Sequence, residues 1–314
     1  MMKFESEELK FTFKKNKNTI LSPLLELYRG KVYINILKSF INNSINCFGK
    51  EIFSKKKSCV RNLTNILSGW MFSLYSKYNF ANDSFLPNNF NEVNFLKTIF
   101  NDLIKFDKNI EDSDSKIDFI LNNLINTYEY NLNLLNNYKN SKFFEENKDN
   151  FLLSIKLKKK DNGDFYKFII KFPFLVKEKK LNGLLDNIYI PLKVYTRLKN
   201  RYNGPENCFD NYVWIILFRY NLLGSNNHQL GILPCILDKM KIDFKLSFEC
   251  FASSLNSHID NYCSIYYDVE KFFGSKGSFF NLIPEYGTYS FNPPYQIDII
   301  TRGIDKLLNN LSNA

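Results

Sequence analysis

The residues best suited to chemistry are Asn292, Pro293, Pro294 and Tyr295, four consecutive positions near the C-terminal end. Two adjacent prolines fix φ and donate no N–H, so their turn is rigid and its carbonyl groups point outward. The Asn292 side-chain oxygen and the Pro293 carbonyl then offer two fixed acceptors, and Tyr295 offers a ring for stacking a base. Acceptors aimed at the N–H groups of an adenine amine stabilise the cation that develops when this weak nucleophile takes a methyl group. The four residues are therefore our candidate catalytic group, although an ordinary Asn-Pro turn would have the same sequence.

A second segment, residues 247–256, has the pattern of an apolar strand, a turn of small residues and a following helix. Nucleotide-type cofactors bind at the carboxyl ends of such strands, where small side chains let backbone amides approach. The sequence contains neither a G-x-G pattern nor a P-loop motif, so this segment also fits an ordinary buried strand.

The remaining elements must position these two segments. Apolar residues at three- and four-residue intervals predict helices at 20–47, 60–78, 91–106 and 116–138. Alternation on both sides of Asn162-Gly163 predicts a β-hairpin with strands at 151–159 and 165–176, joined by a type I′ turn. Beyond residue 190 we expect helices at 191–202, 211–223, 229–240, 257–263 and 297–311 and strands at 246–252 and 286–291. This pattern divides the chain into a helical domain (1–145), a hairpin connector (146–190) and an α/β domain (191–314).

The formal net charge of +10 is concentrated in the N-terminal half. Residues 191–314 hold 12 Lys and Arg against 11 Asp and Glu, which leaves 30 and 21 of the totals for residues 1–190. A basic N-terminal half beside a nearly neutral C-terminal half is typical of a protein that binds a polyanion next to a catalytic pocket. A solvated, lysine-rich surface explains the same numbers, and both interpretations apply to the runs Lys55 to Lys57 and Lys156 to Lys160.

Several classes of protein are disfavoured. The six cysteines and two histidines show no zinc-ligand spacing, so we predict reduced thiols and no metal site. The sequence has no G-x-S-x-G motif for a serine hydrolase. Its start is charged and no apolar run approaches the ~18 residues of a membrane span, so we expect a soluble intracellular protein without a membrane partner, in the nucleus or the cytoplasm.

The order and spacing of motifs over residues 191–296 resemble the phosphorylated-CTD-interacting-factor family, the cap-specific adenosine N6-methyltransferases. The residues that carry the resemblance are Phe248 to Ser253, Leu255-Asn256, Tyr262 to Ser264, Asp268, Phe273 to Gly277 and Asn292 to Tyr295, with Trp214, Arg219-Tyr220 and Gln229-Leu230 upstream.

This resemblance implies an α/β protein, with a helical N-terminal region followed by a Rossmann-like class I methyltransferase fold. It also implies S-adenosylmethionine as the methyl donor and the capped 5′ end of mRNA as the partner, with the cap-adjacent 2′-O-methyladenosine as acceptor. Asn292, Pro293, Pro294 and Tyr295 match the target-amine site. The implied cofactor-binding residues are Phe251, Ala252, Ser253, Ser254 and Asn256, with Phe273 and Gly274 adjacent.

Two departures from the family lead to further expectations. Trp70 and Trp214 are too far apart to form a WW module, so we predict that this module is lacking and that binding to the RNA polymerase II tail is not implied. Only 19 residues follow Tyr295. The Rossmann-like fold is therefore expected to be incomplete, and the strand ending at Asn292 to have an unpaired edge. That edge would be covered by the 151–176 hairpin or by a partner, or else the chain is a fragment, which we favour.

Two other functions stay open. A DNA adenine N6-methyltransferase would carry the same Asn-Pro-Pro-Tyr sequence, so the tetrapeptide cannot separate DNA from RNA. A catalytically inactive RNA-binding homologue would result if an incomplete sheet cannot hold the cofactor.

Overall fold

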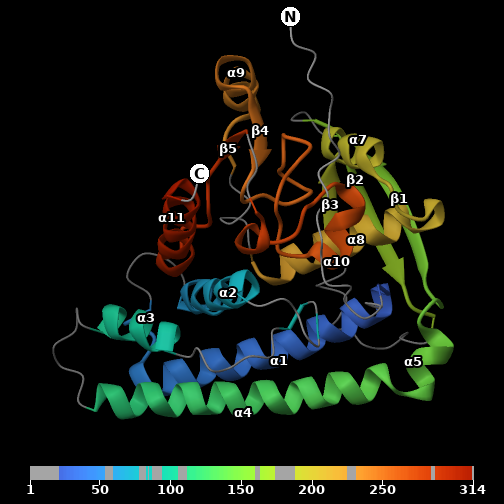
Figure 1. Ribbon diagram of the computed structural model, residues 1–314. Coiled ribbons are helices and arrows are strands. Elements are labelled where there is room, and N and C mark those ends of the chain that lie inside the picture. Colours follow the sequence, from blue (N-terminus) through green and yellow to red (C-terminus); the bar gives the residue numbers. More distant parts are fainter. Residues whose placement is uncertain are drawn as a thin grey trace, which may run out of the picture.

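Helices from the N-terminal half form one layer of the molecule (Figure 1). The computed structural model describes residues 21–53, 59–77, 83, 85–86, 94–104, 112–159, 163–173, 188–224, 231–283 and 287–312. The long helices α1 and α4 lie side by side, and α2 and α3 pack above them (Figure 1). These helices confirm the four predicted ones: α1 (Pro23–Phe48), α2 (Cys59–Lys77), α3 (Asn94–Ile104) and α4 (Ser113–Lys139), with a short α5 (Lys142–Asn147) after them.

The predicted hairpin is part of a three-stranded antiparallel sheet. Strand β1 (Leu152–Lys158) pairs with β2 (Phe165–Lys171), and β2 pairs with β3 (Ile188–Pro191), which we did not predict. Lys158 and Phe165 are the last pair before the connection, and the type I′ turn that we predicted there stays a prediction because residues 160–162 lie outside the described residues. Gly163 has φ +114° there, whereas Asn162 lies outside the described residues.

The C-terminal half alternates helices with short strands, so the mixed α/β class is confirmed. Its elements are α7 (Leu192–Arg201), α8 (Phe209–Leu222), α9 (Pro234–Phe244), β4 (Leu246–Glu249), α10 (Tyr267–Glu270), β5 (Thr288–Ser290) and α11 (Ile297–Ser312), with 3₁₀ turns at Glu206–Cys208, Lys271–Phe273 and Phe279–Asn281. Gln229 and Leu230, predicted to open a helix, lie outside the described residues, as do Lys55 to Lys57 and Lys160.

The predicted helix at 257–263 was wrong. The backbone N–H groups of His258 and Ile259 donate to the Glu249 carboxylate at 2.6 Å each, not to helical carbonyls. Tyr262 then forms parallel bridges with Glu249 and with Ser275. Side-chain acceptors that capture backbone donors compete with a helix in this way.

Strand β4 pairs in parallel with β5, and the two bridges at Tyr262 extend this alignment. The resulting lateral order is Ser290, Glu249, Tyr262 and Ser275, with every neighbouring pair parallel. Within the described residues no strand pairs with the far edge of β5. The hairpin does not cover that edge, because β1 and β2 belong to the other sheet.

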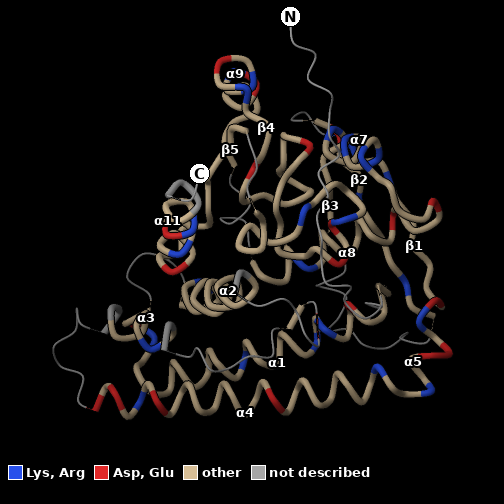
Figure 2. The backbone as a smooth tube through the Cα atoms, viewed as in Figure 1, with Lys and Arg blue, Asp and Glu red and all other residues tan. Residues whose placement is uncertain are grey.

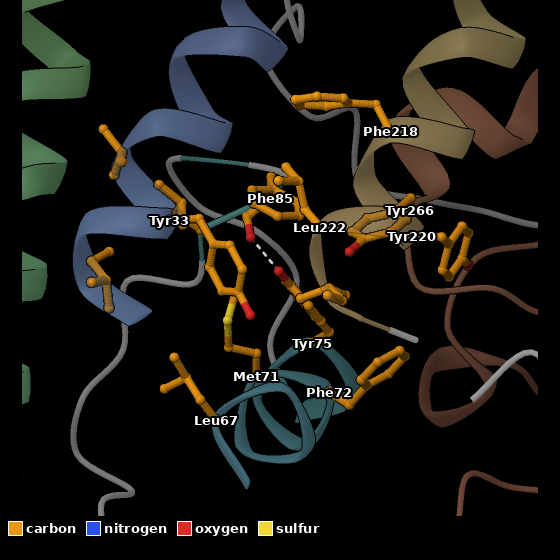
Figure 3. Close-up of a cluster of buried hydrophobic side chains, with 14 of the residues drawn as sticks. Tyr33, Leu67, Met71, Phe72, Tyr75, Phe85, Phe218, Tyr220, Leu222 and Tyr266 are labelled. Atoms are coloured by element: carbon orange, nitrogen blue, oxygen red, sulfur yellow. Dashed lines mark hydrogen bonds between the residues drawn. The ribbon is translucent and has the colours of Figure 1, made fainter. Parts of the chain in front are cut away.

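One hydrophobic core connects the N-terminal helices with the C-terminal half. Figure 3 shows Tyr33 of α1 and Met71 and Tyr75 of α2 facing Phe85, Tyr220 of α8 and Tyr266, and the Tyr75 hydroxyl donates to the Phe85 carbonyl. The two tryptophans, Trp70 and Trp214, are both buried in this core. The proposed boundaries at 145 and 190 stay predictions, but the two halves share this interior.

A buried network of charges ties the same elements together. Arg219 of α8 is fully buried and binds Glu26 of α1 at 2.6 Å and Asp268 of α10 at 2.8 Å. Arg29, one turn after Glu26, binds both Glu26 and Asp83, and Lys139 of α4 binds Asp83 at 2.6 Å. Buried ion pairs add little net stability, but removing one partner leaves an uncompensated buried charge.

We therefore expect Arg219→Met to destabilise the fold by about 3–5 kcal/mol, because Glu26 and Asp268 would lose a shared partner in the interior. Urea unfolding at pH 7 measures the change. Lys97→Met is the matched control, since Lys97 pairs with Asp118 at the surface and its loss should cost much less stability. Equal costs for the two variants would contradict the assignment of Arg219 as the centre of the network.

The Asp83 carboxylate predicts a dependence of stability on pH. Burial opposes its ionisation, yet Arg29 and Lys139 hold its pKa well below the usual range. A depressed pKa contributes stability above the unfolded value near 4, and this contribution is lost as pH falls toward the folded value.

Asp83→Asn should destabilise the protein by about 3 kcal/mol at pH 7. The difference from wild type in the free energy of unfolding should shrink by about 1 kcal/mol at pH 3. Urea titrations at both pH values, with the surface variant Asp118→Asn as control, measure it. An unchanged difference at pH 3 would show that Asp83 does not titrate as described.

Candidate functional site

The Asn-Pro-Pro-Tyr sequence leaves the end of β5 and turns toward α11. Asn292, Pro293 and Pro294 are half-buried, whereas the Tyr295 side chain is 82% exposed. The Pro294 carbonyl accepts the N–H of Gln296 at 2.7 Å, which closes the turn. Among the described residues, nothing donates to the Asn292 side chain or to the Pro293 carbonyl. The Asn292 side-chain oxygen and the Pro293 carbonyl therefore accept no hydrogen bond from the described residues and are available to a ligand.

The bend at residues 250–256 lies between β5 and the Tyr262 segment. The N–H of Cys250 donates to the Ser290 carbonyl and that of Ala252 donates to the Cys263 carbonyl, both at 2.9 Å. The Asn256 side-chain oxygen accepts the N–H of Ser253 at 2.7 Å and thereby closes a turn. The helix expected after this turn is not formed in the described chain, because the turn is stabilised by its own side chains.

A buried carboxylate supports the bend from below. Glu270 is fully buried and accepts the N–H of Ser254 at 2.7 Å and the Tyr220 hydroxyl at 3.2 Å. The Ser254 hydroxyl pairs with the Tyr262 hydroxyl at 2.8 Å. Burial raises the pKa of Glu270, while the N–H groups of Ser254 and Tyr266 oppose that rise. Through these two hydrogen bonds, Ser254 stabilises the bend.

A pocket opens where the bend and the tetrapeptide meet, with about 980 Å³ of empty space including its mouth. The predicted site residues that line it are Asn292, Pro293, Pro294, Tyr295, Phe251, Ala252, Ser253 and Asn256. The structure therefore brings the two candidate segments together around one hollow. Their catalytic and cofactor-binding roles stay predictions.

Three predicted cofactor residues lie outside the pocket lining. The Ser254 hydroxyl is hydrogen-bonded to the Tyr262 hydroxyl and stabilises the bend. Phe273 is fully buried and packs against Tyr202 and Phe209. Gly274 has φ +100° and ends the 3₁₀ turn formed by Lys271–Phe273. We predicted Phe273 and Gly274 beside the cofactor; in the structure Phe273 packs in the core and Gly274 ends a turn, and their cofactor role stays a prediction.

Several pocket residues were missed by the sequence reasoning. Phe72 of α2 and Tyr220 of α8 reach the pocket from the core, and Glu249, Phe279 and Phe280 complete its walls. Phe72 and Tyr220 occupy apolar helix positions, which have the same pattern whether they face a core or a cavity. The two phenylalanines follow the glycine-containing stretch that ends at Gly277, and this proximity was the available signal.

Helix α11 holds the aromatic wall in place. The Arg302 guanidinium lies 4.4 Å from the centroid of the Phe280 ring. Lys306 donates to the carbonyl groups of Phe280 at 3.0 Å and Leu282 at 2.5 Å. Burial lowers the pKa of Lys306. The wall is therefore fixed by the same helix that follows the tetrapeptide.

The Cys250 thiol in the pocket is poorly suited to covalent catalysis. Burial raises the pKa of Cys250 to about 12, so this pocket thiol is protonated at neutral pH and is a poor nucleophile. The described residues contain no group of three or more His, Cys, Asp or Glu arranged to hold a metal ion. Among the described helices, none is both long and apolar enough to cross a bilayer.

Comparison with known proteins finds similarity over part of the chain. Residues 190–314 match the family model described as "Phosphorylated CTD interacting factor 1 WW domain". A Mus musculus protein named mRNA (2'-O-methyladenosine-N(6)-)-methyltransferase is 34% identical over 105 residues, which cover 31% of this chain and 15% of that protein. A Homo sapiens protein of the same name is 36% identical over 89 residues, or 26% of this chain and 13% of that protein. The matched part of this chain thus spans about 15% of the length of these curated relatives.

The family match corrects two predictions. We expected this chain to lack the WW domain, but the matched model carries that description over residues 190–314. The same match contradicts our prediction that binding to the RNA polymerase II tail is not implied. Our criterion required two neighbouring tryptophans, whereas the matched segment contains one, Trp214, buried within α8. The comparisons support a methyltransferase family whose named members act on mRNA.

Proposed function

We propose that this chain belongs to an S-adenosylmethionine-dependent N6-methyltransferase of adenosine in RNA and that its pocket is the site of transfer. The observation that carries this proposal is one hollow lined both by Asn292 to Tyr295 and by the 251–256 bend. Asn292 and Pro293 present their acceptors there without a protein donor among the described residues. Both residues are half-buried and line the cavity, so their acceptors are open to a ligand there.

The parallel alignment supports a cofactor site of the Rossmann-like kind. Ser290 and Glu249 pair in parallel within the two-stranded sheet, and two isolated parallel bridges, Glu249 to Tyr262 and Tyr262 to Ser275, continue this order beside it. In open α/β sheets, ligands bind at the carboxyl ends of the strands. The pocket lies at this end, where β4 leads into the bend and β5 into the tetrapeptide.

The residues of the bend fit a cofactor of this class. S-adenosylmethionine, when bound, supplies an electrophilic methyl group on a sulfonium ion. Phe251, Ala252, Ser253 and Asn256 would lie along it, and Glu249 offers a carboxylate at the pocket edge. That carboxylate is already oriented by two backbone N–H groups, so it is preorganised to receive hydroxyl or ammonium groups.

The tetrapeptide would orient the acceptor. The Asn292 side-chain oxygen and the Pro293 carbonyl accept the two N–H groups of the adenine amine and stabilise the positive charge that develops on N6. Tyr295 stacks on the extracted base from the mouth of the pocket. After transfer, N6 loses one proton to solvent. Two fixed acceptors also keep the nitrogen in line with the methyl group.

The relatives' names favour the 2′-O-methyladenosine of mRNA as the acceptor, and the family resemblance implies that this nucleotide is next to the cap. A DNA adenine N6-methyltransferase, or an inactive RNA-binding homologue, would place the same tetrapeptide at the same pocket. The name of the family model also favours a second function, the binding of a phosphorylated polymerase tail. A fluorescently labelled phosphoserine peptide of that tail tests this function directly.

Asn292→Ala should reduce methyl transfer to capped adenosine RNA by at least about a hundredfold, because one of the two acceptors is lost. Thermal unfolding and S-adenosylmethionine binding should stay as in wild type. Asn200→Ala, on the exposed surface of α7, is the matched control.

Wild-type activity in the Asn292 variant would reject the proposed site. Running the same assay on duplex DNA separates the alternatives. A preference for DNA would reject the RNA assignment, although the pocket chemistry would stand.

Asn256→Ala should weaken S-adenosylmethionine about tenfold, because the Ser253 N–H loses its acceptor and the turn opens. Isothermal titration measures this affinity, with Asn200→Ala again as control. An unchanged affinity would move the cofactor away from the bend. Failure of the wild-type chain to bind the cofactor at all would favour the non-catalytic alternative.

A further inference from the structure

The three-stranded sheet has one face that packs on the core and one that faces solvent. Phe168, Ile170, Ile188 and Ile190 fill the packed face. Because side chains alternate along a strand, the residues between them belong to the opposite side. We call this side the outer sheet face; its members are Leu152, Ser154, Lys156, Lys158, Phe165, Lys167, Ile169, Lys171, Tyr189 and Pro191.

The outer sheet face carries four lysines and no acidic residue. Lys156, Lys158 and Lys171 are exposed, and within the described part of the chain none of them forms an ion pair. Figure 2 shows basic positions along β1. Lys156 lies directly opposite Lys167 across the two strands. Like charges in such positions destabilise a sheet, and a bound polyanion would remove that cost.

Aromatic rings stand beside these cations. Tyr189 is 40% exposed, and its ring meets that of Phe165 edge-on, with centroids 5.5 Å apart. The Lys167 ammonium lies 5.5 Å from the centroid of the Tyr189 ring. Phe165 thus supports Tyr189 from the side. A supported, partly exposed ring within a row of cations is the arrangement on which single-stranded nucleic acids stack their bases and place their phosphates.

We infer that the outer sheet face is a second contact site for single-stranded RNA, separate from the pocket. No residue of β1, β2 or β3 lines the pocket, so the two sites do not share a side chain. RNA as the ligand rests on the proposed function. The site would hold the chain of the substrate through its backbone and one stacked base, without reading sequence.

The chemistry of the face favours RNA over a phosphopeptide. Phosphate groups on peptides are recognised by compact arginine clusters that bind in a bidentate manner. This face has no arginine, and its lysines are spread over two strands instead of converging on one point. Dispersed point charges beside a ring suit a repeating backbone with bases attached.

The test measures binding of a fluorescent twelve-nucleotide oligouridine by anisotropy over a series of salt concentrations. Oligouridine has no adenine amine, so the pocket chemistry does not contribute. The test variant changes Lys156, Lys158, Lys167 and Lys171 to Ala. A matched control removes the same charge from exposed lysines on four helices, through Lys38→Ala, Lys142→Ala, Lys199→Ala and Lys239→Ala.

For the test variant, the slope of log affinity against log salt should become less steep by about 3, because each single-strand phosphate contact contributes about 0.7. Its affinity at low salt should fall at least about tenfold. The control should stay within about twofold of wild type. Equal losses in the two variants would show a general effect of net charge and would overturn the inference.

Tyr189→Ala should weaken oligouridine about fivefold or more without changing the salt slope, because it removes stacking and no charge. Tyr189→Phe should bind like wild type. Thermal unfolding of each variant checks that the sheet is intact. A loss in the phenylalanine variant equal to that in the alanine variant would contradict stacking on this ring.

Two further comparisons separate the possible failures. If a phosphoserine peptide of the polymerase tail binds the wild type and the four-lysine variant loses it, while both bind oligouridine equally, the face serves a phosphopeptide and the inference is wrong. Asn292→Ala should bind oligouridine like wild type whatever its activity. If the four-lysine variant binds oligouridine normally while Asn292→Ala loses methyl transfer, the second site fails and the proposed function stands.

Discussion

The parallel pairing of β4 with β5 is the constraint on which the rest of the site depends. Each strand is short, and each is followed at once by one of the two candidate segments. The hydrogen bond from the Cys250 N–H to the Ser290 carbonyl at 2.9 Å fixes the two exits beside each other. Parallel strands end on the same side, so the bend and the Asn-Pro-Pro turn must face one hollow. An antiparallel pairing would have put them at opposite ends.

Such a small parallel sheet cannot stand alone, and the N-terminal helices supply what it lacks. Phe72 of α2 lines the pocket, and Tyr220 of α8 both lines it and donates to Glu270 beneath the bend. These side chains belong to the core that the Arg219 network crosses from α1 to α10. The helical half is therefore part of the site's support. A pocket built this way links its geometry to contacts between residues almost 200 positions apart.

Much of the fold followed from periodicity, and much of the site from residue chemistry. The four N-terminal helices and the hairpin were visible as repeats of apolar residues, because each has one face on the core. The helix at 257–263 was predicted wrongly because the Glu249 carboxylate, which accepts the N–H groups of His258 and Ile259, lies nine and ten residues before them in sequence. Phe72 could not be predicted as a pocket residue for another reason, since an apolar helix position has the same pattern in a core and in a cavity wall. The WW assignment was missed because the tryptophan spacing that we used as a criterion does not describe the matched segment.

We propose above all that Asn292 and Pro293 receive an adenine amine in line with a methyl donor held by the bend. A crystal structure of the full chain with S-adenosylhomocysteine and a capped adenosine oligonucleotide tests it most directly. We expect N6 to lie about 3 Å from both the Asn292 side-chain oxygen and the Pro293 carbonyl. We also expect the thioether sulfur of the cofactor product to face that nitrogen from the side of the bend. An adenine bound elsewhere, or a cofactor product outside the hollow between the two segments, would contradict it.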